Sequence, residues 1–169
     1  MYMNNNPMLK NAFTMTSIIV ILSGAVALYF HLFGSAFIQS ISELTAESSA
    51  FTLNLLGANV RTSGTIVASD RFAYNIVAEC TAIGPLILYV GAALAFPTDV
   101  RSKIIGAGLG LFFIGGLNVI RLVSLFYIGT YAPEQLDLFH LLIWQGVMIL
   151  SVVMLWLFWV RRWGHATSA

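Results

Sequence analysis

The sequence predicts an all-α integral membrane protein with four transmembrane helices, and with an outward-facing interfacial helix and a short β-hairpin between the first two. Hydrophobic residues make up 59% of the 169 residues and charged residues only 9%, whereas a soluble domain carries roughly 25% charged residues. Four apolar runs approach the roughly 20 residues that a membrane-spanning helix needs. A soluble protein is therefore excluded, and the length predicts a single membrane-embedded domain over residues 1–169.

The first expected span, residues 13–38, follows a short polar tail. This apolar run is too long for the core of a secretory signal and lacks a small-residue cleavage site, so we expect it to remain as an anchor. His31 lies in its outer half and is interpreted as an interfacial or packing histidine.

The longest polar stretch, residues 39–79, follows this span. Between residues 42 and 56, apolar side chains recur at helical spacing, with Glu43 and Glu47 on the polar side. This pattern predicts a helix that lies in the membrane interface.

Residues 60–67 and 71–78 alternate apolar and polar side chains and are separated by a short polar turn. Alternation with a period of two predicts a short β-hairpin. Such a hairpin would deliver Cys80, which follows it, to the membrane in a fixed orientation.

Three further spans are expected at residues 81–96, 104–129 and 140–160. The third span is rich in glycine, and Gly106 and Gly110 stand four residues apart. Small residues at this spacing let helices approach closely in lipid. The fourth span ends in tryptophans followed by arginines, as a helix end at a membrane interface does.

Four spans place both termini on one side of the membrane, and the basic residues indicate which side. Cytoplasmic segments carry the excess of Lys and Arg near span ends. Both termini and the 97–103 loop are therefore expected in the cytoplasm, and the 39–79 and 130–139 segments outside. Five basic residues lie with the termini (Lys10, Arg101, Lys103, Arg161 and Arg162), and two lie in the opposite segments (Arg61 and Arg71).

Three chemically active side chains from three spans are expected to meet at the outer face of the cytoplasmic membrane. Cys80, the only cysteine, stands at the outer end of the second span, and His140 stands at the outer end of the fourth. Arg121 lies about eight residues inside the outer end of the third span, roughly 12 Å at the helical rise, and its long side chain can extend toward the interface. Asn118 shares its helical face and is a candidate substrate-binding residue.

Cysteine, histidine and arginine together suit acyl transfer through a thioester. The thiolate is the nucleophile, and a nearby cation helps a thiol to ionise. Histidine can protonate the leaving amine and later deprotonate the incoming nucleophile, and arginine can stabilise the thiolate or the tetrahedral oxyanion. One cysteine and one histidine without a second pair make a poor zinc site, so no metal or cofactor is expected.

Each of these residues also has a structural interpretation. A lone cysteine can pack inertly, a histidine at a helix entrance can be solvated, and a buried arginine can hold a bundle together. Arg121 favours function most strongly, because an arginine within a span costs about 2.5–3.5 kcal/mol on insertion scales. Two alternatives stay open: a non-enzymatic transport or assembly subunit in which Arg121 binds an anion or a partner helix, and a plain cysteine protease of the membrane.

The motifs around these residues are Glu79-Cys-Thr-Ala-Ile-Gly, then Gly115-Gly-Leu-Asn-Val-Ile-Arg-Leu, then His140 at the start of the final span. In order and spacing they resemble the exosortase/archaeosortase family, over residues 60–159. The number of spans resembles the compact exosortase H type. The chain departs from the pattern of many members, Cys-Ser/Thr-Gly, because Ala82 and Ile83 separate Thr81 from the glycine.

This resemblance implies a membrane-embedded cysteine transpeptidase. Its partners would be exported proteins that end in a sorting signal, made of a short motif, a transmembrane helix and a basic cluster; for the compact type the motif begins Ile-Pro-Thr-Leu. The enzyme would cleave the signal and transfer the acyl group to an acceptor lipid or glycan of the cell surface, with no nucleic acid involved. By this resemblance Cys80 is the nucleophile, Arg121 the stabiliser of the thiolate or oxyanion, and His140 the acid and base.

Overall fold

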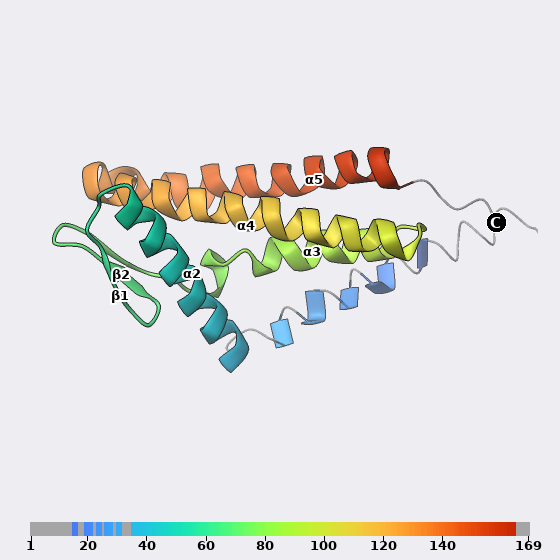
Figure 1. Ribbon diagram of the computed structural model, residues 1–169, viewed down its shortest axis with the longest axis horizontal. Helices are drawn as coiled ribbons and strands as arrows, with labels where there is room; N and C mark the ends of the chain where they lie inside the picture. Colours follow the sequence, from blue (N-terminus) through green and yellow to red (C-terminus); the bar gives the residue numbers. More distant parts are fainter. Residues whose placement is uncertain are drawn as a thin grey trace, which may run out of the picture.

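The computed structural model describes residues 15–16, 19–21, 23–24, 26–28, 30–31 and 35–164, and most of these are helical (Figure 1). The α-helices from residue 36 onward are α2 (Ala36–Leu55), α3 (Ile83–Ala95), α4 (Val100–Tyr131) and α5 (Trp144–Trp163). The strands are β1 (Arg61–Ser63), β2 (Ile66–Ala68) and β3 (Ala73–Asn75). Two 3-10 helices, Ala78–Cys80 and Pro133–Gln135, and a π-helix, Leu138–Ile143, complete these elements.

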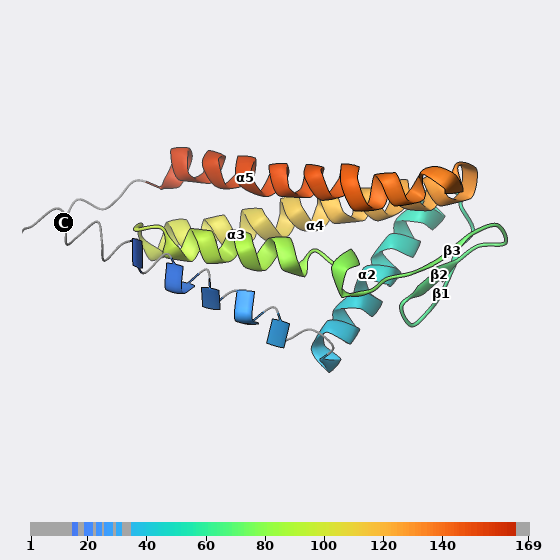
Figure 2. The ribbon, with the colours of Figure 1, turned by 180° about the vertical axis from the view of Figure 1, so that it is seen from behind.

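Helices α3, α4 and α5 run side by side and form a long bundle, and both opposite views show this arrangement (Figures 1 and 2). The sheet and the segment that joins α4 to α5 lie at one end of the bundle, here called the sheet end. The loop between α3 and α4 lies at the other end with the last turn of α5, here called the loop end. Helix α2 crosses the bundle obliquely near the sheet end.

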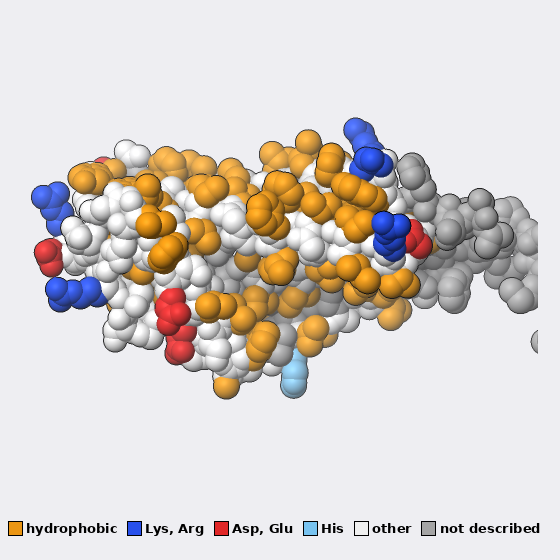
Figure 3. All heavy atoms as spheres, viewed as in Figure 1, with side chains coloured by type: hydrophobic (Ala, Val, Ile, Leu, Met, Phe, Trp, Pro, Cys, Tyr) orange, Lys and Arg blue, Asp and Glu red, His pale blue; other side chains and the backbone are white. Residues whose placement is uncertain are grey.

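Among the described residues, two helical segments are long and apolar enough to cross a membrane: α4, and the run Pro133–Trp163 that contains α5. Helix α3 is apolar but has 13 residues, about 20 Å at the helical rise. The count of four spans therefore stays a prediction. On the face shown in Figure 3, hydrophobic side chains are spread over the surface between the two ends. The Lys and Arg side chains gather at the two ends themselves.

The first expected span, residues 13–38, lies only partly within the described residues. Those described between 15 and 31 are helical, and His31 among them is exposed. The prediction was wrong at the end of this span, because residues 36–38 belong to α2. Ser35 explains this start, since its hydroxyl accepts a hydrogen bond from the Ile38 N–H (3.3 Å) and caps the helix.

Helix α4 begins four residues before the expected start at residue 104 and extends to Tyr131. Asp99 caps it: one carboxylate oxygen accepts from the Ser102 N–H (3.0 Å) and the other from the Ser102 hydroxyl (2.7 Å). These bonds, first that from the Ser102 hydroxyl and then that from its N–H, hold the pKa of Asp99 below its usual range. Counting apolar residues alone missed this polar first turn.

Two glycines of α4, Gly106 and Gly110, lie directly against aromatic rings of the neighbouring helices. A Cβ atom on Gly110 would lie 2.5 Å from the ring of Tyr89 on α3, and one on Gly106 would lie 2.7 Å from the ring of Trp159 on α5. Both rings are fully buried, and the Trp159 indole donates to the Ser102 carbonyl (2.8 Å). The expected close approach of helices at these two glycines is present, and an aromatic side chain fills each contact.

The short hairpin expected over residues 60–78 is an antiparallel sheet of three strands in the order β1-β2-β3. The expected first strand, residues 60–67, divides at Gly64, where Ser63 pairs with Ile66 across a two-residue turn. Gly64 has φ 59°, and two-residue hairpin turns need such positive φ angles. The prediction of one strand there overlooked the Ser-Gly turn signal.

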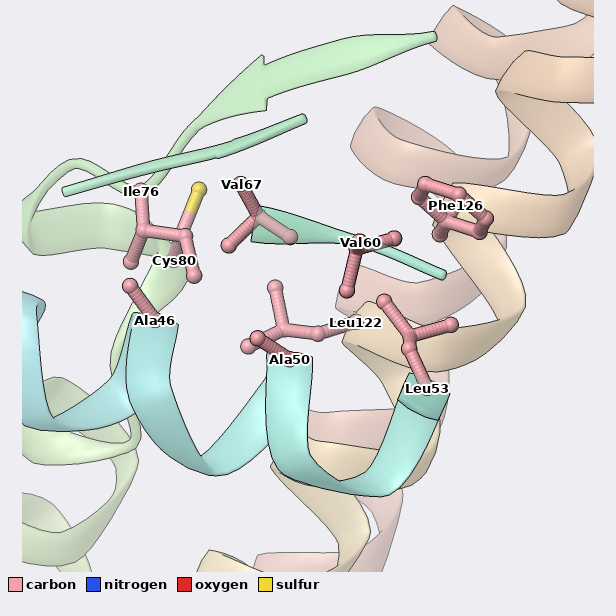
Figure 4. Packing of buried hydrophobic residues seen from close by; sticks show 9 residues of the cluster. All are labelled: Ala46, Ala50, Leu53, Val60, Val67, Ile76, Cys80, Leu122 and Phe126. Atoms are coloured by element: carbon pink, nitrogen blue, oxygen red, sulfur yellow. The ribbon is translucent and has the colours of Figure 1, made fainter. Parts of the chain in front are cut away.

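A hydrophobic cluster joins α2, the sheet and α4 and contains Cys80 (Figure 4). Helix α2 contributes small side chains at helical spacing, so that the sheet and α4 pack closely against it. Other apolar side chains of α2 lie on its outer side, and Phe51 among them is 67% exposed. The buried members of the cluster are Ala46, Ala50, Leu53, Val60, Val67, Ile76, Cys80, Leu122 and Phe126.

Candidate active site

Cys80 ends the 3-10 helix between β3 and α3, and its side chain is 6% exposed. The Cys80 N–H donates to the Val77 carbonyl (2.9 Å). Thr81 secures the turn, because its hydroxyl donates to the Ala78 carbonyl (2.7 Å) and accepts from the Ile83 N–H (3.4 Å). The turn therefore holds Cys80 directly ahead of α3.

Ala82 and Ile83, the two residues that separate Thr81 from Gly84, lie at the start of α3. Ala82 is the N-cap of this helix and Ile83 is its first residue. Helix α3 begins at Ile83, so Pro85 is its third residue. The N–H groups of a first turn have no partner within the helix, and a proline there loses nothing.

Arg121 and Asn118 face Cys80 from α4 and are buried, with 7% and 2% of their surfaces exposed. The Asn118 amide nitrogen donates to the Cys80 carbonyl (3.0 Å), and the amide oxygen accepts from Arg121 Nη1 (3.4 Å). Arg121 Nη2 donates to the Glu79 carbonyl (3.4 Å). Two main-chain carbonyls of the turn thus accept from side chains of α4.

His140 lies close to both Cys80 and Arg121. Its Nε2 lies 3.9 Å from Cys80 Sγ and 3.4 Å from Arg121 Nη2. A guanidinium can only donate, so Nε2 is unprotonated and accepts in the contact with Arg121. The Cys80 Sγ lies near the same nitrogen, and an unprotonated histidine can take a proton from a cysteine.

The π-helix Leu138–Ile143 carries His140. A π-helical turn holds more residues than an α-helical one, and such turns recur at functional sites. Its last hydrogen bond runs from the Trp144 N–H to the Phe139 carbonyl.

Tyr74 of β3 lies near the cysteine and packs against the cluster that contains it. Burial raises the pKa of Tyr74, the hydrogen bond with Ser49 (2.7 Å) lowers it, and the negative charge of a Cys80 thiolate raises it further. The net pKa is above the ordinary value, so this hydroxyl stays neutral beside the cysteine.

A groove of about 480 Å³ opens from this site along α3 and α5, and Val26 of the N-terminal segment also lines it. Glu79 and Arg121 line it beside the cysteine, and most of its remaining lining is apolar. Within the described residues, no three His, Cys, Asp or Glu side chains are grouped so that they could hold a metal ion.

A model of the transmembrane exosortase family matches residues 9–159 of this chain. The chain belongs to this family. No curated protein matches it, and no solved structure does either. Membership confirms the resemblance found in the sequence motifs and makes the chain an integral membrane protein of a family of sorting transpeptidases.

In this exosortase the four residues singled out from the sequence, Cys80, Asn118, Arg121 and His140, lie together. Sequence reasoning missed the carbonyl groups of Glu79 and Cys80 as partners of α4, and it missed the role of Thr81 in the turn. Main-chain carbonyls carry no sequence signal. The threonine directly after the cysteine was a usable signal, because Thr side chains bond nearby main-chain groups in turns.

Proposed function

We propose that this exosortase is a cysteine transpeptidase that cleaves a C-terminal sorting signal on exported proteins and transfers the acyl group to a cell-surface acceptor. The observation that carries the proposal is the contact of His140 Nε2 with both Cys80 Sγ and Arg121 Nη2. A thiol, an unprotonated base and a fixed cation are what thioester chemistry requires. An inert packing cysteine needs neither partner.

The first half-reaction forms the thioester. His140 Nε2 takes the Cys80 proton, and the thiolate attacks the carbonyl carbon of the scissile peptide bond. The tetrahedral oxyanion collapses, the C–N bond breaks, and His140 returns the proton to the leaving amine. The helix and basic cluster of the signal leave with that amine.

Arg121 changes partner during this step. Once Nε2 carries a proton it no longer accepts from Arg121, and Nη2 becomes free to donate to the oxyanion. A donor aimed at charge that develops only in the transition state lowers the barrier rather than the energy of the bound substrate.

The second half-reaction releases the acyl group. His140 takes a proton from the acceptor nucleophile, which attacks the thioester carbon, and the C–S bond breaks to release the thiolate. His140 then returns the proton to Cys80 and restores the resting thiol. With water as acceptor the same steps give hydrolysis, so the acceptor alone separates a transpeptidase from a protease.

Asn118 acts within the protein in this proposal, not on the substrate. Both ends of its amide are occupied, one by the Cys80 carbonyl and the other by Arg121. It therefore sets the distance between the nucleophile and the cation.

The proposed orientation has both termini in the cytoplasm, four spans and the active site on the outer face of the cytoplasmic membrane. The excess of basic residues on the side of the termini supports it. In this orientation the sheet end faces outward, and α2 lies in the interface with Phe51 and Leu55 toward lipid.

The test uses an exported reporter that ends in Ile-Pro-Thr-Leu, an apolar helix of about 20 residues and an arginine cluster. Cells with Cys80→Ala, Cys80→Ser or His140→Ala should accumulate the full-length reporter, while wild-type cells process it. Mass spectrometry of the new C-terminus should show added acceptor mass. A free carboxylate would make the protein a protease, and normal processing by Cys80→Ala would end the proposal in favour of a non-enzymatic subunit.

A further inference from the structure

We infer that the groove between α3 and α5 binds the transmembrane helix of the sorting signal while Cys80 acts on the peptide next to it. This inference rests on the proposed function and adds where on the enzyme the substrate helix lies. Arg121 and Glu79 line the groove at the active site, so the groove and the site are continuous.

The lining of α5 has the spacing of a helix-packing surface. The residues that face the groove follow one another at intervals of three and one and so form a single stripe along the helix. Met148 is 4% exposed and packs against α3 and α4, whereas Ile149 and Val153 are 58% and 47% exposed. The stripe consists of Gln145, Met148, Ile149, Val152 and Val153.

The first turns of α3 form the other wall, and Val26 lines the groove as well. The α3 residues of this wall are Gly84, Pro85, Ile87 and Leu88. Two neighbouring helices with apolar stripes create a groove that a third helix can enter with its side chains between theirs. The stripe on α5 begins about one turn beyond His140 and continues for about two turns, or roughly 12 Å. It thus leads away from the active site toward the loop end.

The helix of a sorting signal fits this groove, because that helix directly follows the cleaved motif. With the scissile bond at Cys80, the helix must continue from the active site into the apolar layer, and this groove is lined along that course. A lipid chain would also fill an apolar groove, but this groove is continuous with the active site through Glu79 and Arg121, where the cleaved peptide must lie. The groove is therefore assigned to the helix that continues that peptide.

Neighbouring residues of α5 provide a matched test. Ile149 lines the groove, whereas Leu150 is turned away from it, and the two are similarly exposed (58% and 62%) at nearly the same depth. A photo-cross-linking amino acid is placed at either position in full-length Cys80→Ala enzyme, in membranes that also contain the reporter described above. We expect cross-links to the reporter helix from position 149 and a several-fold lower yield from position 150.

Equal yields at the two positions would overturn the inference, and so would adducts at position 149 with lipid or with a second copy of the enzyme only. Ile149→Trp in the active enzyme should lower reporter processing roughly tenfold or more, because the misplaced helix carries the scissile bond away from the thiol. Leu150→Trp should process at the wild-type rate.

If Ile149→Trp does not accumulate in the membrane, Val153→Trp and Met154→Trp form the same kind of pair (47% and 59% exposed). Wild-type processing by a groove variant would reject the groove and leave the proposed function standing. No processing by the wild type would reject the proposed function and the groove with it.

Discussion

At the scale of single residues, Arg121 makes more side-chain hydrogen bonds within the candidate site than any other residue described there. Its guanidinium donates to Asn118, to the Glu79 carbonyl and to His140, while no described residue offers a hydrogen-bond partner to its buried Nε. A planar group with several fixed donors can hold these three partners at once, whereas an ammonium is a point charge on a flexible stem.

Arg121→Lys should therefore lower reporter processing by roughly 10²-fold, which is the cost of losing one donor to an oxyanion, while the protein still inserts. The ratio of processed to full-length reporter measures this, with a membrane extract to measure insertion. Arg101→Lys, on an exposed residue at the loop end, is the control and should be silent. Processing at the wild-type rate by Arg121→Lys would mean that only the charge matters.

Asn118→Ala should lower the turnover of bound reporter by about tenfold or more, because the carbonyl of Cys80 and the guanidinium lose the amide that spaces them. Asn54 is a matched control: its amide also makes two hydrogen bonds, both to the main chain of Val60 (3.1 and 2.7 Å) and neither to Cys80 or Arg121. Asn54→Ala should lower the Tm and leave turnover per folded molecule unchanged. Equal effects on turnover would make Asn118 merely structural; a loss of reporter binding alone would make it a substrate contact.

At the scale of elements, the packing of α4 depends on which of its glycines meets a ring. Gly110 lies against Tyr89, which is fully buried, whereas a Cβ on Gly108 would meet nothing within 4 Å. The two glycines lie two residues apart on the same helix. Gly110 is on the face that packs against α3, and Gly108 is on a face that packs against nothing within 4 Å.

Gly110→Ala should destabilise the bundle by about 1–3 kcal/mol, the usual cost of overpacking. Gly108→Ala should be neutral or slightly stabilising, because alanine favours helix over glycine. Thermal unfolding in detergent measures both as a change in Tm. An equal Tm for the two variants would show that Tyr89 can move aside.

Sequence reasoning located the elements better than their ends. Long apolar runs identify α4 and α5, because apolar composition is what lipid and core packing both select. The ends of helices depend on polar caps such as Ser35 and Asp99, which hydropathy does not detect. The strands were too short for alternation to resolve, and only Gly64 marked the extra turn.

The candidate site could be predicted in its side chains but not in its support. Cys80, Arg121 and His140 were found because each is out of place in an apolar chain and each stands near one end of a span. The main-chain carbonyls that bind Arg121 and Asn118, and the π-helix under His140, follow from the packing of α4 against the turn. No residue type encodes them.

At the scale of the whole molecule, the charges at the two ends of the bundle decide the orientation. A reporter enzyme that is active only outside the cytoplasm should be active when fused after Pro133 and inactive when fused after Thr98, because the basic residues beside the loop end keep that end inside. Activity of the fusions in membranes measures this. The reverse pattern would put Cys80 in the cytoplasm and exclude exported substrates.

The π-helix that carries His140 makes the direction of this side chain depend on the length of the chain ahead of α5. Such a turn can be described as an α-helix with one inserted residue. Deleting one residue between His140 and Trp144 would restore α-helical spacing, and it would rotate the histidine by about 100° relative to α5. The proposed general base would then point away from the thiol although every side chain of α5 kept its place.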